Sequence, residues 1–177
     1  MSTSISNAVQ RLNSQLPLKL RQAALPRIGQ SILNRRDASL AEQGRPPNRE
    51  ELHELLAGGD VDAALTRLAS DDLVVLNATG NGIAGAYPMT TEDTPHHLKV
   101  NKQPVNAMCA LDALSVGPMF NAEVEISSRC HVTGTAITIH MLGETLREVS
   151  PSPDVHVGVR WQNPSACAAH SMCLEMV

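Results

Sequence analysis

Cys109 and Asp112 lie three residues apart in a long apolar stretch, and these two side chains could carry chemistry together. The stretch 104–116 reads PVNAMCALDALSV, and Asp112 is the only charged residue between Lys102 and Glu123. A carboxyl group that is buried without a cation tends to hold a proton near neutral pH. A thiol that gives up its proton becomes a nucleophile and a soft-metal ligand. The pair would therefore combine a proton donor with a soft ligand.

A plainer interpretation of the same two residues stays open at this point. Cys109 could be a small buried hydrophobic residue, and Asp112 could be a solvated acid at the edge of a helix. A lone cysteine usually favours the plainer interpretation. The isolation of Asp112 among apolar residues favours a functional site. The residue types alone do not decide between the two.

The element that would position the pair is a helix over residues 104–116. Pro104 suits the first turn of a helix, where its missing N–H is not needed. In such a helix one face holds Val105, Met108, Cys109, Asp112 and Val116. The opposite face is also apolar, so we expect a buried central helix.

Residues 1–80 predict a helical unit. We expect helices near 17–33, 49–57 and 61–69, a charged break at 35–37, N-caps at Asn48 and Asp60, and a short strand at 73–76. Two helices followed by a small hairpin are typical of a winged helix, a DNA-binding motif. However, this part of the chain has nine Lys/Arg and nine Asp/Glu, and acids flank its second helix. A structural use is therefore favoured over DNA binding.

From residue 81 onward extended segments predominate. We expect strands at 97–100, 123–128, 136–141 and 155–161, a hairpin turn at 132–135 and a polar loop over 144–153. The predicted fold class is α+β. A winged-helix-like helical unit over residues 1–80 is followed, over residues 81–177, by a core of antiparallel strands packed with the buried central helix.

Composition narrows the function classes further. The net charge of −4 gives no support for a nucleic-acid partner or an acidic membrane surface. No signal peptide and no membrane-spanning apolar run are recognisable, so we expect a cytoplasmic protein. The four cysteines, none of them in a Cys-x-x-Cys motif, are therefore expected to be reactive or metal-binding thiols. A zinc site can be drawn from Cys130, His131, His156, His170 and Cys173, but their spacing is not that of a zinc site.

Four segments of the chain, taken in order, resemble the alkylmercury lyase (organomercurial lyase) family. They are AYPMTTEDTPHHLKV, AMCALDAL, SRCHVTG and MCLEMV, and the resemblance covers about residues 84–177 and, more weakly, the N-terminal helices. It implies an enzyme that cleaves the carbon–mercury bond by protonolysis, which yields a hydrocarbon and Hg(II) and confers mercury resistance. It also implies organomercurials as substrates, with small thiols and mercuric reductase as partners, but no nucleic acid or membrane.

The resemblance implies a role for each cysteine and for the acid. Cys109, Asp112 and Cys173 would be catalytic, with mercury bound by Cys109 and Cys173 and with Asp112 as a further candidate ligand. Cys130 would be structural, and Cys167 has no assigned role. No organic cofactor and no resident catalytic metal are implied, although external thiols would be needed to release the bound Hg(II).

Two departures from the family pattern and one alternative function accompany this expectation. Family members continue beyond the MCLEMV segment, so part of the C-terminal core is expected to be missing from this sequence. Many members have an aromatic residue where this chain has Met108. The alternative is a thiol-based mercury-binding or metal-sensing module that binds the metal without turnover.

Overall fold

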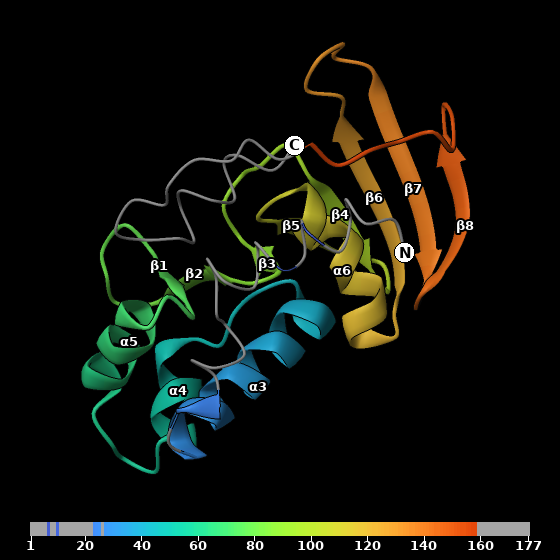
Figure 1. The fold of residues 1–177 in the computed structure, drawn as a ribbon. Helices are drawn as coiled ribbons and strands as arrows, with labels where there is room; N and C mark the ends of the chain where they lie inside the picture. The colour runs from blue at the N-terminus through green and yellow to red at the C-terminus, as the bar shows by residue number, and fades with distance from the viewer. Residues whose placement is uncertain (1–6, 8–9, 11–22, 26, 159–177) are drawn as a thin grey trace.

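A computed structural model describes residues 7, 10, 23–25 and 27–158 of the chain. It confirms the α+β class, because helices pack against an eight-stranded antiparallel sheet of order β1-β2-β3-β5-β4-β6-β7-β8 (Figure 1). The helices are α3 (Arg27–Gln43), α4 (Arg49–Leu55), α5 (Val61–Ser70) and α6 (Ala110–Phe120). The strands are β1 (Val75–Leu76), β2 (Ile83–Ala86), β3 (Met89–Thr90), β4 (His97–Val100), β5 (Gln103–Ala107), β6 (Glu123–Arg129), β7 (Ala136–Leu142) and β8 (Thr145–Ser150).

Helices α4 and α5 begin where the sequence predicts, whereas of the helix predicted near 17–33 the structure describes α3, which begins at Arg27. The Asn48 side chain accepts a hydrogen bond from the Glu51 amide, and the Glu51 side chain accepts one from the Asn48 amide, which completes a capping box. The Asp60 side chain caps α5 by accepting a hydrogen bond from the Ala63 amide at 3.0 Å. The predicted break at 35–37 is wrong, because α3 continues through these charged residues to Gln43.

Two arginines of this helical region form ion pairs with aspartates. Arg49 pairs with Asp62 at 2.6 Å, which joins the starts of α4 and α5. Arg67 pairs with Asp71 at 2.7 Å. These neutralised cations are a poor match for a phosphate backbone. The winged-helix assignment and the division at residues 80 and 81 stay predictions, while β1 and β2 join the same sheet as the later strands.

The predicted helix start at Pro104 is wrong, because residues 103–107 form strand β5 and the helix begins only at Ala110. Asn101 and Lys102 have φ angles of +47° and +74°. Two consecutive positive φ values are those of a tight two-residue hairpin turn, and the turn pairs β5 with β4 from Val100 to Gln103. The predicted turn is thus in the right place, but a strand follows it.

The polar loop predicted over 144–153 is also wrong. Residues 145–150 form β8, the edge strand beside β7, and this strand is exposed along nearly its whole length. Most of its side chains are exposed and only Val149 packs against the core, so the strand lacks the apolar alternation that indicates a half-buried one. The strand predicted at 155–161 is not formed by residues 155–158, and its remainder lies outside the described residues.

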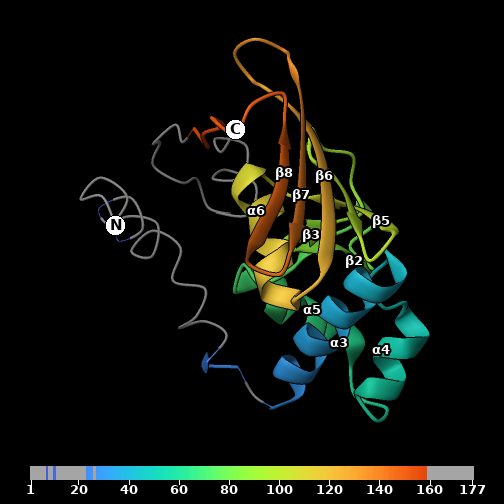
Figure 2. The same cartoon turned by 90° about the vertical axis from the view of Figure 1, so that its right-hand side faces the viewer.

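Helix α6 lies against one face of the sheet (Figure 2). Its buried side faces the inward row of β4, β6 and β7, and the shared core is Leu98, Val100, Ala113, Val116, Val124, Ile126, Ile139 and Met141. The expectation of burial all round is corrected, because Leu111 is 40% exposed and Met119 is 58% exposed. No helix of the described residues is long and apolar enough to span a bilayer.

Helix α3 ends in close contact with the strand that leads to Cys109, which gives a stability prediction. Gly44 has a φ of +65°, and a Cβ atom at this position would lie 2.5 Å from the Pro104 carbonyl oxygen. Gly58 has a φ of +85°, but a Cβ atom there would meet nothing within 4 Å. Gly58→Ala should therefore cost about 1 kcal/mol of unfolding free energy through backbone strain alone, and Gly44→Ala about 2–3 kcal/mol because a clash is added.

Urea unfolding of the two variants beside the wild type measures this difference. The matched Gly58→Ala variant carries the strain without the clash. Equal destabilisation by the two substitutions would show that the contact between Gly44 and β5 is unimportant.

Candidate functional site

The end of β5 is held from three directions. Ala107 donates its amide hydrogen to the His96 carbonyl at 2.9 Å, and its own carbonyl accepts from the Thr94 hydroxyl at 2.7 Å. The amide of Met108 donates to the Pro88 carbonyl at 3.1 Å. These contacts fix the backbone immediately before Cys109, so the position of its thiol is set by the sheet.

Cys109 is the N-cap of α6. Its backbone is extended, with φ −153° and ψ 177°, and its sulfur accepts a hydrogen bond from the Asp112 amide at 3.4 Å. Ser, Thr, Asp and Asn usually fill this position because their side-chain oxygens satisfy free helical amides. Here a sulfur takes that place, close to the positive end of the helix dipole, which favours a thiolate.

The thiol of Cys109 also donates to the Asp112 carboxylate, with a sulfur–oxygen distance of 3.1 Å. Cys109 is only 2% exposed, whereas Asp112 is half-buried. The structure therefore brings the predicted pair together, but at a helix start rather than along one helical face. In this geometry a proton can pass directly between sulfur and carboxylate.

The other residues of the predicted catalytic set cannot be placed in the same way. Cys173 and Cys167 lie outside the described residues, as does His170 of the zinc alternative. Among residues 23–25 and 27–158, no three His, Cys, Asp or Glu side chains are grouped so that they could hold a metal ion. The role of Cys173 as second sulfur ligand stays a prediction.

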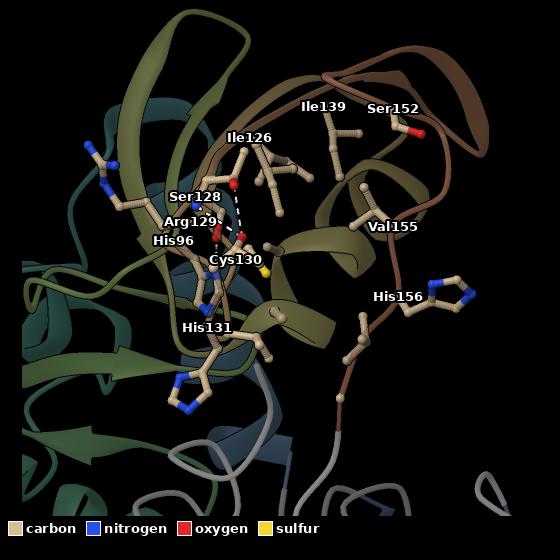
Figure 3. A pocket seen from close by; sticks show the side chains of 18 of the residues that line it. His96, Ile126, Ser128, Arg129, Cys130, His131, Ile139, Ser152, Val155 and His156 are labelled. Carbon is tan, nitrogen blue, oxygen red and sulfur yellow. Dashed lines mark hydrogen bonds between the residues drawn. The ribbon is translucent and has the colours of Figure 1, made fainter.

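A pocket of about 480 Å³ opens beside the start of α6 (Figure 3). Ala110, Ala113 and Leu114 form the helical wall. The sheet contributes the inward-facing residues Ile126, Ser128, Ile137 and Ile139, and the segment 151–158 closes a further side. The pocket is mostly apolar, and Cys109 and Asp112 are not among the residues that line it; their chain neighbours Ala110 and Ala113 are.

Cys130 and His96 line the same pocket. Cys130 follows β6 and is half-buried. Hydrogen bonding by the Thr133 side chain, and then by the amides of Thr133 and Val132, lowers the pKa of its thiol. His96 is 7% exposed, and its burial, with a smaller effect of the neighbouring His97, lowers the pKa of its imidazole.

The sequence reasoning did not single out His96. The available signal was the adjacent pair of histidines at the start of a predicted strand, because alternation along a strand places one inward and the other outward. His96 faces the pocket, whereas the exposed His97 bonds to Asn106 at 3.0 Å. A structural role for Cys130 stays a prediction.

Comparison with known proteins finds similarity to alkylmercury lyases. A sequence model described as alkylmercury lyase matches residues 89–177. An alkylmercury lyase of Streptomyces lividans is 28% identical over 116 residues, which are 66% of this chain and 53% of that protein. The Pseudomonas putida alkylmercury lyase is 30% identical over 109 residues, or 62% and 50% of the two chains. The chain thus spans about half the length of these relatives.

The fold is shared with a solved structure. The crystal structure of the mercury-bound form of MerB2 superimposes with a TM-score of 0.73 over 89% of this chain and 76% of that one, at 24% identity. The matched family segment, residues 89–177, contains Cys109, Asp112 and Cys173 and makes up half of the 177 residues. This chain is accordingly a member of the alkylmercury lyase family.

Proposed function

We propose that the protein cleaves the carbon–mercury bond of organomercurials by protonolysis, releasing a hydrocarbon and Hg(II). The observation that carries this proposal is the 3.1 Å contact between the Cys109 thiol and the Asp112 carboxylate. Protonolysis needs a soft ligand on mercury and an acid close to the carbon atom, and these two groups are such a pair. Family membership supports the same reaction.

The first steps concern mercury capture. The Cys109 sulfur forms a bond to R–Hg⁺, and its proton passes to the Asp112 carboxylate. Cys173 then adds a second sulfur–mercury bond and releases its proton to solvent. Two thiolates push electron density onto mercury and so weaken its bond to carbon.

The final step breaks the carbon–mercury bond. Asp112 gives its proton to carbon, the bonding electron pair leaves with carbon, and R–H departs. Hg(II) stays on the two sulfurs with no change in oxidation state. In this proposal no organic cofactor or resident metal takes part, and small thiols, or mercuric reductase, remove the product.

The apolar pocket beside α6 suits the organic group of the substrate. Its walls are alanine, leucine and isoleucine side chains, which favour an alkyl or aryl group over a charged one. We place the reaction in the cytoplasm, because thiols that must act as thiolates are kept reduced there.

A second candidate function is mercury binding or sensing without turnover. This function would use the same thiols to bind mercury, but the carbon–mercury bond would stay intact. Incubation of the full chain with phenylmercury and measurement of released benzene separates the two functions. Stoichiometric mercury binding without benzene would favour the binding module.

Cys109→Ala and Cys173→Ala should each abolish turnover, because one thiolate cannot both hold and activate the metal. Benzene release per folded molecule is the measurement. Cys167→Ala is the matched control and should keep its activity. An active Cys173→Ala variant beside an inactive Cys167→Ala variant would move the second ligand to Cys167.

Asp112→Asn should separate catalysis from mercury binding. Asparagine is nearly isosteric and keeps the backbone amide that donates to the Cys109 sulfur, but it cannot carry the proton. Single-turnover hydrocarbon release should fall by about 10²–10⁴-fold, whereas mercury affinity should change much less because sulfur supplies most of it.

A control for the helix start is Ser115→Ala. The Ser115 hydroxyl donates to the Asp112 carbonyl at 2.8 Å, so this variant perturbs the same turn and leaves the carboxylate in place. Ser115→Ala should release hydrocarbon at a rate close to wild type. Wild-type turnover by Asp112→Asn would mean that the proton comes from another group.

A further inference from the structure

The proposed chemistry leaves Cys130 without a role, although its thiol lies on the pocket wall. Ile126 and Ser128 point inward from β6, and Cys130 continues this alternating row beyond the end of the strand. A cysteine that only filled space would be buried in the core. Cys130 instead is half-buried and faces the pocket.

Strand register places His96 beside this thiol. His97 pairs with Ser127 across β4 and β6, so His96 lies opposite Ser128. The 2.8 Å contact between His96 Nδ1 and Ser128 Oγ agrees with this register. Cys130 is then the diagonal neighbour of His96 on the same face, and such neighbours have Cβ atoms about 7 Å apart. Figure 3 shows the imidazole and the sulfur on the same side of the pocket.

One nitrogen of this buried imidazole is available to a ligand. His96 is more than nine-tenths buried and lines the pocket, and within the described residues its Nε2 atom has no hydrogen-bond partner. When Nδ1 donates to Ser128 Oγ, Nε2 presents its lone pair. Metal-bound histidines have the same arrangement, in which the second ring nitrogen donates to an oxygen.

The spacing suits one ion shared by the two side chains. A sulfur and a nitrogen bound to the same metal ion lie about 3.5–4.3 Å apart, because each metal–ligand bond is about 2.0–2.3 Å long and the separation is largest when the two bonds are in line. Cysteine and histidine side chains can close a Cβ separation of about 7 Å to this distance. A soft cation such as Hg(II) needs only two ligands, and thiolate is the ligand type that it prefers.

We propose that Cys130 and His96 form a second binding site, for a soft divalent metal cation, on the pocket wall apart from the Cys109–Asp112 pair. In this site the Cys130 sulfur binds as thiolate and His96 Nε2 is the second ligand. The surrounding isoleucines exclude water from the bound ion. The site does not depend on carbon–mercury cleavage, so it can exist whether or not the chain turns over.

The thiolate form is supported by the turn that follows β6. Thr133 and Val132 stabilise the negative sulfur and lower the pKa of Cys130, which increases the fraction ready to bind metal at neutral pH. Burial keeps His96 neutral by lowering the pKa of its imidazole, and a neutral ring is the form that binds metal.

The test uses the full chain with Cys109, Cys167 and Cys173 replaced by serine, so that Cys130 is the only cysteine left. Hg(II), buffered by a competing monothiol, is the probe, and bound mercury is measured after equilibrium dialysis. One ion per chain is expected, and adding Cys130→Ser should abolish binding. His96→Gln in this background should weaken binding by about tenfold or more.

His97→Gln is the matched control, since His97 is the adjacent histidine and is exposed on the other face of β4. It should leave the affinity for Hg(II) unchanged. If His96→Gln and the parent chain bind Hg(II) with equal affinity, Cys130 binds the ion without the histidine and the proposal is overturned. The absence of bound mercury would overturn it too.

If the serine background fails to fold, the number of mercury ions bound per chain is measured by native mass spectrometry on the wild-type chain and on its His96→Gln variant. One ion fewer in the variant supports the second site, and an equal number in both overturns it.

Discussion

The hydrogen bond between the Cys109 thiol and the Asp112 carboxylate depends on a strand and a helix that are separated by only two residues, Met108 and Cys109. Ala107 is tied to the His96 carbonyl and the Thr94 hydroxyl, and Met108 to the Pro88 carbonyl. The helix start then orients the sulfur through the Asp112 amide. A cysteine on a flexible loop would lose conformational entropy on forming a hydrogen bond with an acidic side chain. The fold orients the Cys109 thiol toward the Asp112 carboxylate before substrate binds.

The packing of α6 explains why a pocket opens at one end of the helix and not at the other. Near its C-terminal end Gly117 approaches the Gly143 carbonyl so closely that a Cβ atom would lie 2.8 Å from it. At the N-terminal end the small side chains of Ala110 and Ala113 leave space above Ile126 and Ile139. Tight contact at one end holds the helix, and short side chains at the other leave the room that forms the pocket.

Local patterns in the sequence predicted much of this structure, and long-range contacts account for what they missed. The caps at Asn48 and Asp60, strand β4 and the β6–β7 hairpin all follow from neighbouring residues. The prediction for residues 103–107 is wrong because Pro104 also fits the start of a helix. The segment is a strand because it pairs with β3 and β4, and these contacts are not visible in the local sequence. The three-residue spacing of Cys109 and Asp112 predicted their contact, whereas His96 and Cys130 become neighbours only through the register of β4 and β6.

Strand β8 has a consequence for how the molecule behaves among its own copies. An edge strand offers unpaired backbone groups to any other chain, and a long apolar edge leads to aggregation. The pairing of β8 with β7 is interrupted where Glu148 lies opposite His140 and Leu146 opposite Met141, so Arg147 is an extra, unpaired residue, and both Arg147 and Glu148 are exposed. A second chain that paired here would have to strip water from both charges, so the edge that β8 forms among the described strands resists pairing with another chain even though Leu146 is 53% exposed.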